Sequence, residues 1–140
     1  LPWEPLQPDS LTANVAAQDR DANSLLNLYR RLIHLRSAQS ALAVGELVPL
    51  DASSEAVAAY VRRDGRHAVL VVANLGTGTL NGITVASSAN ALPAGQYTLR
   101  SLLGGGTASP LRVGSDGRIA GYVPVPMLAP MTSYVFDLAR

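Results

Sequence analysis

The sequence contains no cysteine and no lysine, and it has few aromatic and few charged residues. The lack of cysteine excludes disulfides, zinc sites built from thiolates and thiol nucleophiles. Charged residues make up 15% of the chain, against about 25% in ordinary soluble domains, whereas hydrophobic residues make up 48%. This composition favours a well-buried β domain, or a piece of protein whose partner covers part of its apolar surface.

Strong charge and long apolar runs are also missing. The net charge is +1, so neither a nucleic acid nor an anionic membrane is an expected partner. No run approaches the roughly 18 apolar residues of a membrane span. The first ten residues, LPWEPLQPDS, lack the basic start and apolar centre of a signal peptide, and the chain does not begin with Met. We therefore expect a segment from inside a longer protein, and its cellular location stays open.

One long stretch, residues 14–42, has the apolar periodicity of an α-helix. Asp21, Asn23 or Ser24 could cap the helix, since each can accept hydrogen bonds from its first free N–H groups. The apolar side of this helix is unusually wide and predicts burial against a large partner. That predicted packing face consists of Leu25, Leu26, Tyr29, Leu32, Ile33 and Arg36.

The residues before this helix are rich in proline, which predicts an extended connector over residues 1–13. The connector carries Trp3, the single tryptophan of the chain. A tryptophan in such a segment usually anchors it against a core, because burial of the indole removes a large apolar area from water. The alternative is that Trp3 stacks on a sugar ring, as a possible carbohydrate contact.

After the helix the hydrophobic period changes from 3.6 to 2, which indicates strands separated by turns. Residues 67–75 are continuously apolar and predict a central strand covered on both faces. Asp64-Gly65 predicts a tight hairpin before it, and Asn74 a turn at its end. The predicted strands are 45–50, 56–63, 67–75, 79–88, 96–103, 111–113, 118–125 and 131–138. They predict a mainly β fold, an antiparallel Greek-key sandwich of about seven or eight strands.

No stretch of the sequence carries a catalytic constellation. The ten carboxylates lie mostly in connectors and turns, without the pairing that glycoside hydrolysis requires. A G-x-S-x-G nucleophile motif is absent, and the turn around Asp116 is too short for a calcium loop. Gly104–Gly106 lacks the Lys-Ser/Thr of a phosphate loop. We therefore expect no catalytic residue, no metal and no cofactor in this chain.

Three motifs in the N-terminal part resemble one enzyme family. They are PW-x-P at 2–5, T-x-NV-x-AQ at 12–18 and D-x-NSLL-x-LYRRLI-x-LR at 21–36. These motifs resemble the α-amylase family of glycoside hydrolases, most closely its α-glucosidase, oligo-1,6-glucosidase and trehalose-synthase branch. Three motifs that follow are similar to the first strands of the family's C-terminal domain. They are AL-x-x-GE at 41–46, V-x-AYVRR at 57–63 and VLVVANL at 69–75. A last motif, YVFDL at 134–138, is similar to its closing strand.

The resemblance implies a connector from a missing catalytic barrel at 1–20, the final barrel helix at 21–43 and a C-terminal β-sandwich at 44–140. None of the family's catalytic motifs matches a position here. The implied function is a non-catalytic accessory domain of an enzyme acting on α-glucans or α-glucosides, with the catalytic barrel as partner. Two alternatives remain: a carbohydrate-binding module using scattered aromatics (Trp3, Tyr60, Tyr97, Tyr122), or a module that self-associates through the helix.

Overall fold

The computed structural model describes residues 3–65 and 67–140. The chain divides into two compact units, of which the first ends at Ala38 and the second is Gln39–Arg140. The first unit is helical and the second is mainly β, so the predicted fold class is confirmed. The predicted domain limits at residues 20 and 43 stay a prediction.

The first unit contains two helices, α1 (Val15–Arg20) and α2 (Leu25–Ala38). The short helix α1 was not expected within the connector. It begins where Asn14 Oδ1 accepts a hydrogen bond from the Ala17 N–H at 2.8 Å, which satisfies one of the free donors of the first turn. At the start of α2, Ser24 Oγ accepts a hydrogen bond from the Asn27 N–H at 3.3 Å. Of the three candidates predicted from the sequence, Ser24 is therefore the residue that caps this helix.

Side chains join the two helices of the first unit. The Asn27 side-chain amide donates to the backbone carbonyls of Gln18 and Asp21, at 2.9 and 2.8 Å. Arg30 forms an ion pair with Asp19. The Asn27 bonds add side-chain donors to two carbonyl groups that already accept backbone hydrogen bonds, from the N–H groups of Asp21 and Ser24.

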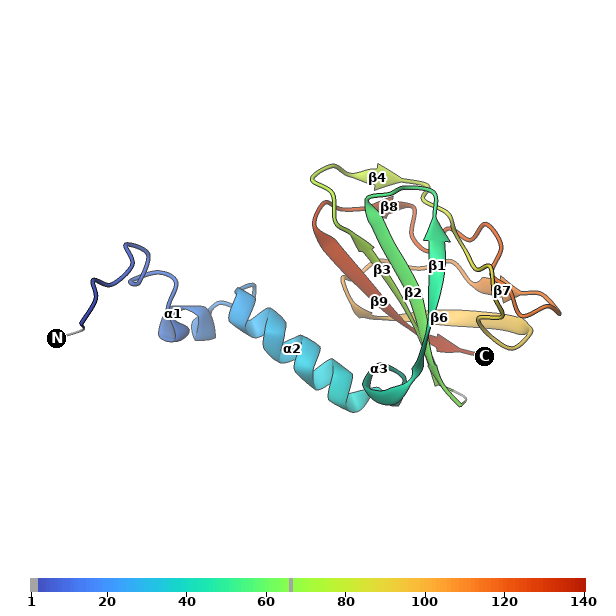
Figure 1. The fold of residues 1–140 in the computed structure, drawn as a ribbon, viewed down its shortest axis with the longest axis horizontal. Helices are drawn as coiled ribbons and strands as arrows, with labels where there is room; N and C mark the ends of the chain where they lie inside the picture. The colour runs from blue at the N-terminus through green and yellow to red at the C-terminus, as the bar shows by residue number, and fades with distance from the viewer. Residues whose placement is uncertain (1–2, 66) are drawn as a thin grey trace. The chain divides into compact units, whose positions relative to one another are not determined.

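The second unit begins with the short helix α3 (Ser40–Val44), which Gln39 separates from α2 by an extended backbone. The single long helix predicted from the sequence is therefore interrupted. The strands that follow are β1 (Glu46–Ala52), β2 (Val57–Asp64), β3 (His67–Asn74), β4 (Leu80–Asn81), β5 (Val85–Ala86), β6 (Gly95–Leu103), β7 (Leu111–Val113), β8 (Met127–Leu128) and β9 (Thr132–Ala139) (Figure 1).

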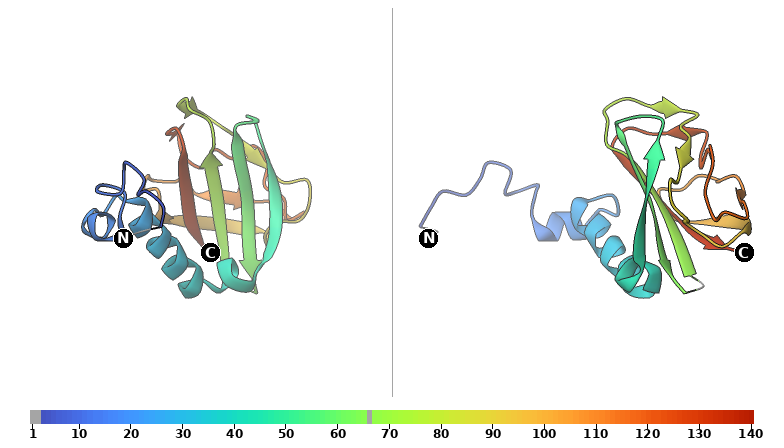
Figure 2. Two further views of the ribbon diagram at one scale, coloured as in Figure 1. Left: turned by 60° about the vertical axis from the view of Figure 1, so that its left-hand side comes forward. Right: turned by 45° about the vertical axis from the view of Figure 1, so that its right-hand side comes forward.

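Seven of these strands form one antiparallel sheet in the order β5-β1-β2-β3-β9-β6-β7, and β4 pairs with β8 in a small second sheet. In Figures 1 and 2, β6 and β7 run across the direction of β1, β2 and β3, so the large sheet curls around the core. The largest fully buried side chains come from both arms of this curl and from the loops between them. They include Phe136, Leu70, Leu92, Leu111, Ile119 and Leu128.

The continuously apolar segment is the centre of the sheet, as predicted. All residues of β3 except His67 are buried, because β2 and β9 pair with it on its two sides and both faces are covered. Alternate residues such as Leu70 and Val72 belong to the core, whereas Val69 and Val71 are buried on the opposite face. A strand with one exposed face alternates apolar and polar residues. The segment of β3 does not alternate in this way, and this was the feature of the sequence that predicted a strand buried on both faces.

Two predicted strands are wrong in extent. The segment 79–88 contains only the two-residue strands β4 and β5, because Gly82 between them has φ +61° and breaks the extended backbone. The segment 118–125 is irregular: Tyr122 bridges Val85, and Ile119 and Pro124 accept single backbone hydrogen bonds from Ser87 and Ser109, without a continuous ladder. Pro124, which lacks an N–H donor, fits a segment outside a ladder. The predicted hairpin at Asp64-Gly65 is centred one residue later, since Asp64 pairs with His67; residue 66 lies outside the described residues.

Candidate functional site

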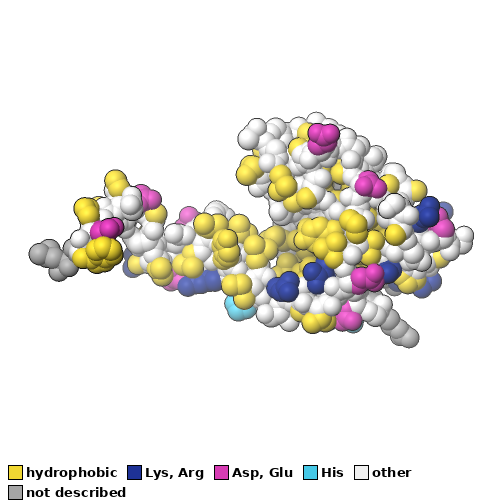
Figure 3. Space-filling model, viewed as in Figure 1, with side chains coloured by type: hydrophobic (Ala, Val, Ile, Leu, Met, Phe, Trp, Pro, Cys, Tyr) yellow, Lys and Arg dark blue, Asp and Glu magenta, His cyan; other side chains and the backbone are white. Residues whose placement is uncertain are grey.

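An exposed apolar row runs along α2. Leu25, Tyr29 and Ile33 follow one another at intervals of four residues, and their exposed fractions are 63%, 59% and 61%. Residues four apart lie on the same side of a helix, so these three side chains form one continuous row. Of the other residues in the predicted packing face, Leu32 is 39% exposed, Leu26 is half-buried and Arg36 is exposed. Figure 3 shows hydrophobic side chains gathered along this helix.

The polar residues of α2 are already engaged within the first unit. Arg30 pairs with Asp19, Arg31 Nη1 donates to the Ala22 carbonyl at 2.6 Å, and Asn27 bonds to the end of α1. The sequence places these three residues away from the apolar row. Because the polar side of the helix is occupied by α1 and its loop, the apolar row is the side that a partner could cover. Its contact with a barrel stays a prediction.

The aromatic residues considered for carbohydrate contact have different environments. Trp3 is 93% exposed, and its contact with a sugar stays a prediction. Tyr97 and Tyr122 are buried in the core, with hydroxyl groups that donate to the carbonyls of Pro93 and Ser109. Tyr60 is half-buried in β2. Tyr97 and Tyr122 therefore serve the packing of the sandwich, and they cannot form an exposed stacking platform.

The carboxylates with ion-pair partners lie on separate elements. Glu46 and Arg63 join β1 to β2 at 2.9 Å, and Asp137 and Arg100 join β9 to β6 at the same distance. Within residues 3–65 and 67–140, no three His, Cys, Asp or Glu side chains come together in a way that could hold a metal ion. In the same part of the chain, none of the helices combines the length and apolar character needed to cross a bilayer.

Burial raises the pKa of Tyr122 from 10.0 to about 12. The unfolded chain would lose this proton near pH 10, whereas the folded chain would keep it until near pH 12. We therefore expect the free energy of unfolding to fall by about 1–2 kcal/mol as the pH rises through this window. Below pH 10 this tyrosine should have no effect on the pH dependence of stability.

Urea unfolding of the wild-type chain and of Tyr122→Phe at several alkaline pH values measures this effect. Tyr122→Phe removes the ionisable group, together with its hydrogen bond to Ser109, at every pH. The stability difference between the two proteins should therefore shrink between pH 10 and 12. A difference that stays constant across this range would contradict the raised pKa.

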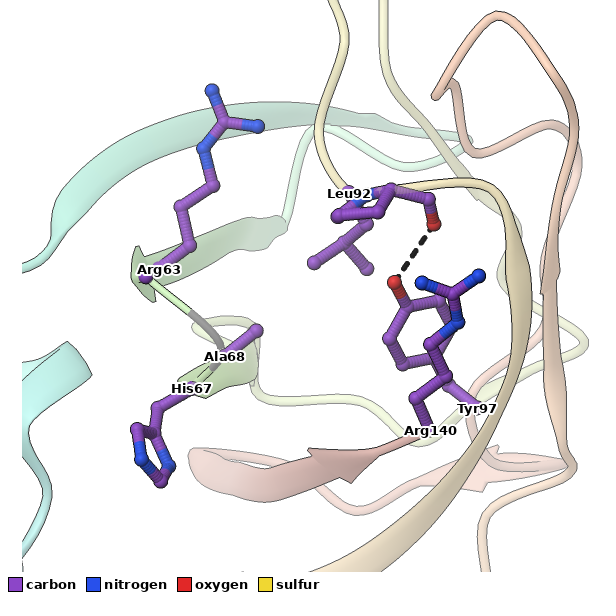
Figure 4. Close-up of a pocket in the computed structure, with 8 residues that line it drawn as sticks. Arg63, His67, Ala68, Leu92, Tyr97 and Arg140 are labelled. Atoms are coloured by element: carbon purple, nitrogen blue, oxygen red, sulfur yellow. Dashed lines mark hydrogen bonds between the residues drawn. The ribbon is translucent and has the colours of Figure 1, made fainter.

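A pocket of about 390 Å³ lies at the end of the sandwich where the β2–β3 hairpin approaches the start of β6 (Figure 4). Its buried lining includes Ala68, Leu92 and Tyr97, and its rim carries Arg63, His67 and Arg140. No pattern in the sequence predicted this pocket. Its residues come from β2, the β2–β3 turn, β3, the loop before β6, β6 and the residue after β9, and no local motif connects them.

No protein-family profile matches the sequence. A glucan 1,6-α-glucosidase of Streptococcus pneumoniae is 34% identical over 74 residues, which are 53% of this chain and 14% of that enzyme. Three solved structures each match almost the whole chain and 22% of their own length. They are isomaltulose synthases of Erwinia rhapontici (TM-score 0.67, 25% identity) and Klebsiella sp. (0.69, 24%), and the trehalulose synthase of Pseudomonas mesoacidophila (0.66, 25%).

These similarities agree with the motifs at 2–36 and with the β-sandwich. The chain spans about one seventh of the curated relative and about one fifth of each solved structure. It lacks the greater part of each of these enzymes. In sequence and in fold, this chain corresponds to the C-terminal part of an α-amylase-family enzyme.

Proposed function

We propose that the chain is a non-catalytic accessory part of an enzyme acting on α-glucans or α-glucosides, and that it packs on the enzyme's catalytic barrel through α2. The observation that carries the proposal is the exposed row of Leu25, Tyr29 and Ile33 on a helix whose polar side is already hydrogen-bonded. The similarity to glucosidase and sugar-synthase structures supports a carbohydrate enzyme as the parent.

Covering this row would stabilise both partners. Each of its three side chains is about 60% exposed, so complete burial would contribute on the order of 1–2 kcal/mol per residue. The β-sandwich would then be held on the barrel by a helix that is joined through Gln39 to α3 and β1. In this arrangement the chain contributes stability and leaves the chemistry to the barrel.

We expect Tyr29→Ser combined with Ile33→Ser to act differently in two settings. In the 140-residue chain the melting temperature should hardly change, because both side chains are already exposed. In the longer enzyme that contains this segment, the same changes should lower the free energy of unfolding by about 2–4 kcal/mol, since they remove buried apolar area. Calorimetry of both proteins measures the difference.

The matched control is His34→Ser, on the same helix and also exposed. It should leave the melting temperature of both proteins unchanged. A double variant as stable as the wild type in the longer enzyme would refute packing through this row. If the 140-residue chain sediments as a dimer and Tyr29→Ser with Ile33→Ser makes it a monomer, the row serves self-association instead. Turnover of an α-glucoside by the 140-residue chain would refute the non-catalytic role.

A further inference from the structure

The pocket at the end of the sandwich has an unbalanced charge. Among the described residues, two arginines and one histidine lie on its rim, and no Asp or Glu side chain lines it. The floor is apolar, with Leu92 only 1% exposed and Ala68 and Tyr97 each 5% exposed. A concave site with an apolar floor and a few charged groups at its edge is typical of pockets for small molecules, which measure about 300–1,000 Å³.

The two arginines of the rim are not equivalent. Arg63 is held in place by Glu46, and its Nη1 also donates to the Ala91 carbonyl at 3.0 Å. Arg140 has no hydrogen bond or ion pair with any residue in the described part of the chain. The charge of Arg63 is thus offset by Glu46, whereas the guanidinium of Arg140 keeps all of its donors for a ligand.

The side chain of Arg140 lies beside a glycine. Gly95, at the start of β6, has φ +154°, and a Cβ atom there would lie 2.8 Å from Arg140 Nε. The side chain of Arg140 therefore lies close against the backbone of Gly95, and a larger residue at position 95 would make the guanidinium shift. Figure 4 shows the Arg140 guanidinium beside Tyr97 on one side of the pocket, with Arg63 and His67 on the other side.

The wall beside this guanidinium is fixed. The Tyr97 hydroxyl group donates its proton to the Pro93 carbonyl at 2.7 Å, so the phenol is held in place and has no proton left to donate to a ligand. The donors that face the pocket on this side therefore come from Arg140. A planar guanidinium binds carboxylates and phosphates through two parallel hydrogen bonds.

We infer that this pocket binds a small molecule carrying a phosphate group, with Arg140 holding the anion and the floor of Ala68, Leu92 and Tyr97 receiving the body. The site is independent of the α2 row, and it does not depend on the proposed role in a longer enzyme. Free inorganic phosphate and a phosphorylated sugar share the required chemistry.

The test uses three titrations of the isotope-labelled 140-residue chain, followed by NMR at constant ionic strength. The ligands are inorganic phosphate, glucose 6-phosphate and glucose. We expect saturable shifts at the amides of Ala68, Gly95 and Tyr97 with at least one of the two anions and none with glucose. Tighter binding of glucose 6-phosphate would identify a phosphorylated sugar as the ligand class, and equal binding would identify the free oxyanion.

Variants decide whether Arg140 carries the binding. Arg140→Gln should weaken anion binding about tenfold or more, and Arg140→Lys should weaken it less, because lysine keeps the charge without the two-donor geometry. The control Arg112→Gln removes the same charge from an exposed position on β7 outside the pocket and should leave binding unchanged. The amide spectra show whether each variant is folded. Equal weakening by Arg112→Gln, unchanged binding in Arg140→Gln, or no saturation with either anion up to about 10 mM would overturn the inference.

Discussion

Replacing Asn74 by alanine should lower the free energy of unfolding by about 2–4 kcal/mol, a large share of the total stability of a domain. Asn74 is 1% exposed at the end of β3. Its side-chain amide donates to the carbonyls of Gly78 and Ala129, at 2.8 and 3.0 Å, and its Oδ1 accepts from the Gly76 N–H at 3.0 Å. Alanine would leave these part-buried backbone groups without their partner in the protein.

The second substitution at this position separates packing from hydrogen bonding. Asn74→Asp keeps the shape of the side chain but places a carboxylate against two carbonyl oxygens, so it should destabilise the fold more than alanine does at neutral pH. Acidification that protonates the carboxyl group should restore part of the loss, because the acid form has one proton to donate. Urea unfolding at neutral and acidic pH measures both variants.

The control for this position is Asn81→Ala, an exposed asparagine on β4, which should change stability by less than about 0.5 kcal/mol. An effect of Asn74→Ala as small as that of Asn81→Ala would show that water replaces the lost bonds. Asn74 was expected to form a turn, and its bond to Gly76 does so. Its bonds to the segment before β9 were not foreseeable, because more than fifty residues separate the partners.

Gly45→Ala should destabilise the second unit by about 2–4 kcal/mol for a steric reason alone. Gly45 joins α3 to β1 with an ordinary backbone, φ −64° and ψ 155°. A Cβ atom there would lie 2.4 Å from the Ala41 carbonyl oxygen and 2.7 Å from that of Arg63. Both oxygens belong to regular structure, one in α3 and the other in β2, so neither can move without disturbing its element.

Gly78→Ala provides the matched comparison. Position 78 has open space where a Cβ atom would lie, and its φ is outside the left-handed region. We expect the free energy of unfolding of Gly78→Ala to stay within about 0.5 kcal/mol of the wild-type value. Urea unfolding measures it, and the slope of the free energy against urea concentration should not change. A loss at position 45 no larger than that at position 78 would contradict the predicted clash, because the lower entropy of the unfolded chain stabilises both variants alike and cancels in the comparison. Gly45 also explains one motif of the family resemblance, since AL-x-x-GE needs a glycine where the helix meets the sheet.

The fold class was predictable because it depends on local patterns that the curled sheet preserves. The alternation in β2 and the continuous apolar run of β3 both survive in the structure as one-sided and two-sided burial. The strand predictions failed where a turn changes the direction of the chain. Gly82 breaks the strand predicted at 79–88. The two residues of β8, Met127 and Leu128, pair with β4, a strand far from them in the sequence, and no local pattern encodes such a pairing.

The sequence by itself determined the strands with clear periodicity, the amphipathic character of α2 and the resemblance to the C-terminal part of α-amylase-family enzymes, since each of these is carried by neighbouring residues. Only the tertiary structure decided which polar groups work together. Asn74 reaches the loop before β9, and Arg63, Tyr97 and Arg140 meet at one pocket, because the curl of the sheet brings distant segments together. Hydrogen bonds and pockets depend on distances in space, and the order of residues along a chain does not specify those distances for segments so far apart.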